Sequence, residues 1–179
     1  MLALVLSMVV SADPVVAVAQ FDVTGGADPR LGRAFASVVE ADLKAAGVAV
    51  RTEDQLGPKE WGKVKGATYV VTGTIVKIGA KQAITCRILS VGDQSAVASA
   101  TLKSWSDRAA LTNAVLTQLK QSPPAKTAPL QVDEALMTAW GEALEAVHSG
   151  DPAVAKKRVA DVVMRWPSFT PAVERLAQL

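Results

Sequence analysis

The sequence predicts an α/β (α+β) fold, with a mixed sheet of about five strands that is packed by helices and followed by a small all-α segment. Three observations support this prediction. Short apolar runs alternate with a helical pattern early in the chain, two glycine turns divide residues 67–105 into three strand-like segments, and residues 132–179 have helical periodicity throughout. The order of these patterns places the sheet first and the all-α segment at the carboxy terminus.

The amino terminus has the pattern of a secretory signal peptide. Residues 2–10, LALVLSMVV, form an apolar core, and Val10 and Ala12 stand at the two small-residue positions that a signal peptidase reads. The run is shorter than the roughly 20 apolar residues of a membrane-spanning helix. We expect residues 1–12 to be a signal peptide cleaved after Ala12, which predicts a periplasmic or secreted protein. The alternative is a buried first strand or helix that is retained.

Residues 13–120 are expected to form the α/β domain, beginning with a strand and a helix. The near-continuous apolar run at residues 14–23 is typical of a strand buried on both faces. The next apolar positions share one helix face. They are Leu31, Ala34, Phe35, Val38, Val39, Leu43 and Ala46. Arg33, Glu40 and Lys44 lie outside this stripe.

A short strand and a short helix are expected after Gly47, because glycine commonly ends a helix at this position. Residues 48–52 have strand character. Thr52 and Gln55 have the spacing of a capping box, which predicts the start of a short helix. A basic loop around Trp61 then leads to the next strand.

Three strands joined by two tight turns are expected over residues 67–105. Residues 67–78 are rich in β-branched side chains, and residues 82–91 alternate between two faces. One face of the second strand is made by Ile84, Cys86 and Ile88, and one face of the third by Ala96, Ala98, Ala100 and Leu102. The short turns predict an antiparallel meander, and a helix is expected from Asp107 onwards.

The clearest boundary in the chain is residues 121–131, which hold three prolines in eleven positions and predict a stiff linker. Three helices are expected beyond it, at residues 132–147, 152–166 and 169–179. One face of the first carries Leu136, Trp140, Leu144 and Val147.

Composition excludes several classes of function. The formal charge is +2 with acids and bases interspersed, which argues against nucleic acid as a partner. A single cysteine excludes an intrachain disulfide and a cysteine-based zinc site. Cys86 is expected to be a small core residue, and His148 to complement a helix end or to be exposed. No spacing in the sequence argues for a catalytic pair, and neither G-x-G-x-x-G nor G-K-[ST] is present, so we expect no enzyme, cofactor or metal site.

Four segments together resemble a known family. In chain order they are VAVAQFDV, LGRAFASVVEADLKAAGVAV, GATYVVTGTIVKIG and SAVASAT. They are similar to the secreted α/β domain shared by the TolB amino-terminal region, the CsgG curli-secretion family and the FlgO-like flagellar accessory proteins. The resemblance covers residues 15–120. It implies a non-enzymatic module of the bacterial cell envelope.

The tail, residues 132–179, is similar to a tetratricopeptide repeat. The positions that match its turn, packing residue, core positions and terminal proline are Gly150, Asp151, Ala155, Val159, Val162 and Pro167. About three repeats are needed to bury a continuous core, and this tail holds about one and a half. It is therefore expected to pack on the α/β domain, on another copy of the chain, or on a partner.

The repeat register implies that Met137, Trp140 and Leu144 face the concave side and bind a protein partner. The alternative is that this face covers the α/β domain. We therefore expect an accessory or assembly protein of the cell envelope that acts through protein partners or self-association and has no integral membrane span. A second interpretation is an intracellular or membrane-tethered regulatory module of a signalling protein, which requires residues 1–12 to be retained.

Overall fold

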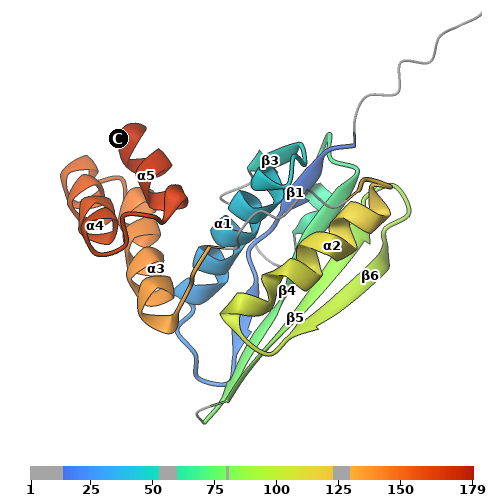
Figure 1. Ribbon diagram of the computed structural model, residues 1–179, viewed down its shortest axis with the longest axis horizontal. Coiled ribbons are helices and arrows are strands. Elements are labelled where there is room, and N and C mark those ends of the chain that lie inside the picture. The colour runs from blue at the N-terminus through green and yellow to red at the C-terminus, as the bar shows by residue number, and fades with distance from the viewer. Residues whose placement is uncertain (1–13, 53–59, 80, 123–129) are drawn as a thin grey trace, which may run out of the picture.

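The computed structural model describes residues 14–52, 60–79, 81–122 and 130–179. They form a mixed sheet of six strands, with two α-helices on one face and a helical segment at the carboxy terminus (Figure 1). The strand order is β3-β1-β4-β5-β6, and β2 pairs with β4 beyond the end of β1. The predicted α/β class with a mixed sheet is therefore confirmed.

The first apolar run forms two short strands where one was predicted, and this accounts for the sixth strand. β1 (Val16–Val18) and β2 (Asp22–Thr24) both run parallel to β4 (Tyr69–Ile78). Between them the Phe21 N–H donates to the Gly32 carbonyl oxygen on the first helix, at 3.3 Å. A Cβ at Gly32 would lie 2.1 Å from the Phe21 carbonyl oxygen, so only glycine permits this departure from the sheet.

Helix α1 (Arg30–Ala45) and strand β3 (Val50–Thr52) follow as predicted. The Asp28 carboxylate accepts from the Arg30 N–H and pairs with the Arg30 guanidinium, which lowers the pKa of Asp28 and anchors the start of α1. The apolar stripe of α1 faces the sheet, where the Phe35 ring meets Phe21 edge to face at 4.8 Å. The helix predicted from Thr52 and Gln55 lies largely outside the described residues.

The predicted meander is confirmed. β4, β5 (Lys81–Ser90) and β6 (Ser95–Leu102) pair antiparallel in sequence order. The predicted core face of β5 is buried, with exposed fractions of 0–1% for Ile84, Cys86 and Ile88.

One predicted face in the meander is wrong. Ile88 lies opposite Ala98, and Leu89 lies opposite Ala96, so Val97 is an extra residue in β6. This β-bulge shifts the alternation of the strand by one position. Ala96 is therefore exposed, and it does not share the core face with Ala98.

The main core lies on the helical face of the sheet. α1 and the pair η2 (Trp105–Arg108) and α2 (Ala109–Gln118) cover this face, and the Trp105 ring lies 5.4 Å from Phe35. A smaller buried cluster lies on the opposite face. Its members are Ala17, Ala19, Val64 and Val70. The short helix η1 (Trp61–Lys63) places Trp61 against this cluster, so the predicted basic loop packs on the sheet.

The tail consists of three helices, as the sequence predicts: α3 (Glu134–Ser149), α4 (Pro152–Arg165) and α5 (Thr170–Ala177). The Asp133 carboxylate caps α3 by accepting from the Leu136 N–H at 2.7 Å. Gly150 ends α3 with φ +82°.

The tail packs against α1, on the side of the helix away from the sheet. In Figure 1, α1 lies between the sheet and α3. Glu40, which lies outside the apolar stripe, is only 9% exposed there. One continuous buried cluster extends from Val16 on the sheet through Phe35 to Trp140 and Phe169 in the tail. The α/β domain and the tail therefore share a core.

None of the helices within the described residues is both long enough and apolar enough to cross a membrane.

Cys86 provides a test of the meander. Its side chain is fully buried, and burial raises the pKa of the thiol to about 12. We predict that a thiol reagent labels Cys86 only after denaturation, as followed by mass spectrometry at pH 8. Rapid labelling of the native protein would show that the Ile84, Cys86 and Ile88 face is not in the core.

Candidate functional site

The candidate site is the junction between α1 and the tail, because the three predicted partner-binding residues lie there. Met137, Trp140 and Leu144 are 0%, 1% and 2% exposed, and the Trp140 ring meets Phe169 edge to face at 5.4 Å. In this arrangement the three side chains pack inside the chain, as in the alternative that this face covers the α/β domain. Partner binding by these residues stays a prediction, and it would require the helices to separate.

A close approach between α1 and α3 holds the junction together. A Cβ at Gly141 would lie 2.9 Å from the Arg30 Cβ, so the absence of a side chain allows the two helices to touch. Arg30 Nη1 also lies 3.6 Å from Glu142, and Lys77 on β4 pairs with Glu134 on α3 at 2.6 Å. These ion pairs are partly exposed and each contributes about 0–1 kcal/mol. Packing at Gly141 and Trp140 therefore stabilises the junction more than the ion pairs do.

Arg108 forms a buried polar connection between three segments. It is 1% exposed, and its Nε donates to Asp42 on α1 at 2.6 Å. The other guanidinium nitrogens donate to the carbonyl oxygens of Trp105 and Leu130, the latter at 2.7 Å. Burial raises the pKa of Asp42, and the charge and hydrogen bond of Arg108 oppose that shift. Arg108 thus ties the chain segment just before α3 to the α/β domain.

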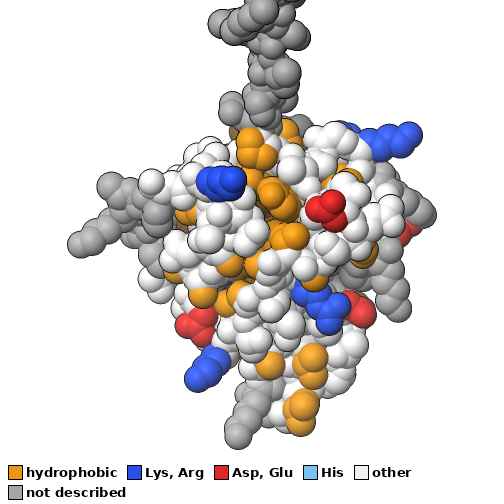
Figure 2. Space-filling view, turned by 90° about the vertical axis from the view of Figure 1, so that its right-hand side faces the viewer, with side chains coloured by type: hydrophobic (Ala, Val, Ile, Leu, Met, Phe, Trp, Pro, Cys, Tyr) orange, Lys and Arg blue, Asp and Glu red, His pale blue; other side chains and the backbone are white. Residues whose placement is uncertain are grey.

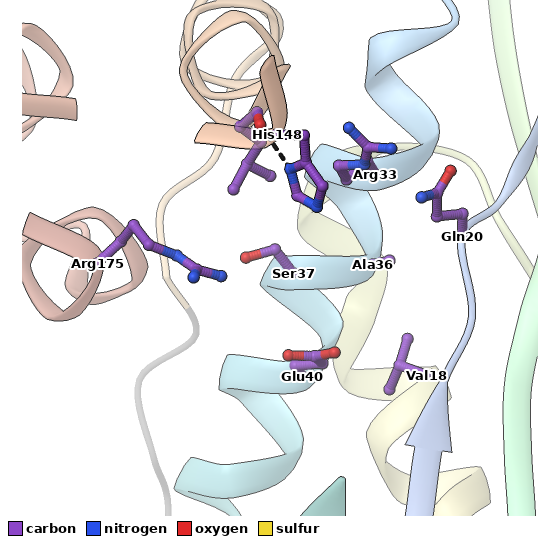
Figure 3. A pocket seen from close by; sticks show the side chains of 9 residues that line it. Val18, Gln20, Arg33, Ala36, Ser37, Glu40, His148 and Arg175 are labelled. Atoms are coloured by element: carbon purple, nitrogen blue, oxygen red, sulfur yellow. Dashed lines mark hydrogen bonds between the residues drawn. The ribbon is translucent and has the colours of Figure 1, made fainter. Parts of the chain in front are cut away.

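A polar cleft runs through the junction beside this packing. Figure 3 shows the side chains that line it, from the bend after β1, from α1, from the end of α3 and from α5. Its polar members are Gln20, Arg33, Ser37, Glu40, His148 and Arg175. The narrow centre has a volume of about 20 Å³, which suits one water molecule.

Two wider hollows adjoin the narrow centre of the cleft. One of about 230 Å³ lies beside Gln20, Arg33 and Gly141. The other, of about 250 Å³, lies beside Glu40 and Trp140. The cleft therefore offers space for small polar ligands on both sides of its centre.

The lining includes a histidine with a defined hydrogen bond. His148 Nδ1 lies 2.7 Å from the Leu144 carbonyl oxygen, so Nδ1 carries the proton and Nε2 remains for the cleft. This position in the last turn of α3 agrees with the expected role beside a helix end. Cys86 lies in the sheet core and does not reach the cleft. Within the described residues, no group of three or more histidine, cysteine, aspartate or glutamate side chains could hold a metal ion.

The polar lining could not be found from the sequence. Gln20, Arg33 and Arg175 lie in three segments spread along the chain, and no motif connects them. The packing of the tail on α1 brings them together. Trp140 and Leu144 were found because their helical spacing predicts one face, although that face contacts α1 within the chain.

Comparisons with known proteins find similar folds at low identity. TolB from Acinetobacter baumannii is 19% identical with a TM-score of 0.44, and the match covers 63% of this chain and 29% of that chain. A PelC dodecamer from Paraburkholderia phytofirmans is 24% identical with a TM-score of 0.42, covering 62% and 92%. The carboxy-terminal domain of LpoB from Salmonella enterica is 13% identical with a TM-score of 0.38, covering 53% and 84%.

No family model and no curated protein matches the chain. At these TM-scores the structural likenesses do not assign a function. The likeness to CsgG and FlgO-like proteins, and that of the tail to a tetratricopeptide repeat, stay predictions.

The packing of Trp140 generates a stability prediction. Trp140→Ala should lower the free energy of unfolding by about 3–5 kcal/mol, because it leaves a cavity between α1, α3 and α5. Trp166→Ala, at a partly exposed tryptophan that ends α4, should cost less. Urea unfolding followed by circular dichroism measures both. An unchanged stability for Trp140→Ala would contradict the packing of the tail on α1.

Proposed function

We propose that this chain is an exported, non-enzymatic accessory protein of the bacterial cell envelope that acts by binding protein chains, including copies of itself. In this proposal residues 1–12 are a signal peptide and residues 13–120 form a domain of the TolB and CsgG type. α3 and α4 form a tetratricopeptide-like helix pair, and α5 is the first helix of a second pair. The apolar segment that ends in VSA supports export.

The observation that carries protein binding is an edge of the sheet on which no other described strand pairs. β6 is the outermost strand, and its sequence SAVASATL contains neither a charged residue nor proline. An outer strand presents unpaired backbone N–H and C=O groups, which usually require charged residues, proline or a bulge to prevent pairing with another chain. The bulge at Val97 protects only one part of the strand. Residues 98–102 remain a regular and uncharged edge.

The surroundings of this edge are also poor in charge. α2, which packs on β6, has the sequence AALTNAVLTQ without a charged side chain. β6 lies on the right of Figure 1, the side that Figure 2 turns to the viewer, where charged side chains are few and scattered and hydrophobic atoms form a band. Depletion of charge is typical of the centre of protein interfaces. An extended segment of another chain could add to the sheet here.

The alternative, a regulatory module of a signalling protein, differs from this proposal in where the native chain begins. It requires residues 1–12 to be retained, whereas export predicts a native protein that begins at Asp13. The amino-terminal sequence of the native protein separates the two interpretations.

A charge on the edge strand tests the proposed function. Thr101→Lys, at an exposed position of β6 opposite Thr85, should reduce self-association in light scattering and reduce the proteins cross-linked to the chain in the cell envelope, because a charge on an edge strand opposes pairing with another chain. Ser168→Lys is the matched control, since it introduces the same charge at an exposed serine in the tail. Equal association for both variants and the wild-type chain would contradict binding through β6.

A further inference from the structure

Arg33 on α1 has no partner within the described part of the chain. It is half-buried, its Nε atom is buried without a hydrogen bond, and neither a hydrogen bond nor an ion pair joins its guanidinium to another described group. A half-buried guanidinium without a partner is uncommon in native structures, because unpaired polar donors destabilise a fold. The Nε atom has almost no accessible surface, so a ligand would contact the Nη1 and Nη2 nitrogens, which are not buried in this way. The position of Arg33 therefore requires an explanation.

The other charged groups around Arg33 are already engaged. Arg30 donates from Nη2 to Asp28 at 2.6 Å, and Glu40 and Arg175 each interact with another group of the chain. Glu145 lines the same end of the cleft. Its side chain is 63% exposed and lies 3.7 Å from Arg30, and it forms no ion pair with Arg33. An incoming anion would therefore not have to displace an existing partner of Arg33.

Space for an anion adjoins Arg33. The hollow between the start of α1 and α3 has a volume of about 230 Å³ and is lined by Gln20, Arg30, Arg33, Gly141 and Glu145. Figure 3 shows Arg33 and Gln20 at the same end of the cleft, away from Glu40. A guanidinium binds a carboxylate or a phosphate through two parallel hydrogen bonds, which makes this the ligand class that fits.

We propose that Arg33 and the hollow between α1 and α3 bind a small oxyanion, either a carboxylate or a phosphate group. The site lies where the tail meets the α/β domain, so an anion held there contacts both parts of the shared core. Binding at this site is independent of protein binding through β6. The same chemistry could come from a free ion or from an anionic group on a larger molecule that enters the open side of the hollow.

Titrations with inorganic phosphate and with acetate, at constant ionic strength, test the site. The full chain is labelled with nitrogen-15, and the Arg33 Nε–Hε resonance is followed together with the thermal midpoint. We expect a saturable shift of this resonance and a rise in the midpoint with at least one of the two anions. Arg33→Gln should abolish the rise, and Arg33→Lys should weaken binding by about tenfold because the two-pronged contact is lost.

Arg87→Gln is the control, because Arg87 is an exposed arginine on β5, and Arg87 does not line the cleft. It should bind the anion as the wild-type chain does. An equal rise in the midpoint for Arg33→Gln would show general stabilisation by anions and overturn the site. If the Arg33 Nε–Hε resonance responds to neither anion, water alone satisfies the guanidinium, and this result also overturns the site.

Discussion

Burial of α1 on two sides is the constraint on which the rest of the structure depends. Its apolar stripe covers the sheet through Phe35 and Val38, and its other side is covered by the tail through Trp140 and Leu144. The tail packs against α1 through α3 and α5, and one buried cluster joins all three tail helices to α1 and the sheet. The polar cleft exists because the polar residues of α1 lie within this contact.

Polar contacts position the tail more than they stabilise it. The ion pairs of Arg30 and Lys77 with α3 are partly exposed and contribute little, whereas the buried Arg108 fixes the Leu130 carbonyl oxygen just before α3 begins. Loss of one member of a buried ion pair leaves the other charge without compensation, so Asp42 and Arg108 depend on each other. Among the described residues, β6 is the outermost strand of the sheet, at the opposite end of the strand order from β3.

The elements were predictable from the sequence because their periodicities are strong. Alternation identified β5 and its buried Ile84 and Cys86, and helical spacing identified α1 and all three tail helices. The bulge at Val97 was missed because alanine fits a buried face and an exposed face equally well. The alternation along β6 therefore gave no sign of the position where the register shifts. The cleft was missed because Arg33 and Glu40 have the pattern of a solvated face, and a single sequence carries no signal for which helix will cover it.

The central claim is that the α/β domain and the tail share one core, and scanning calorimetry of the full chain tests it most directly. The shared core predicts a single transition whose calorimetric enthalpy equals the van't Hoff enthalpy, because neither part can unfold without exposing the buried side of α1. Two separate transitions, or a calorimetric enthalpy well above the van't Hoff value, would show that the tail unfolds independently and would contradict the account.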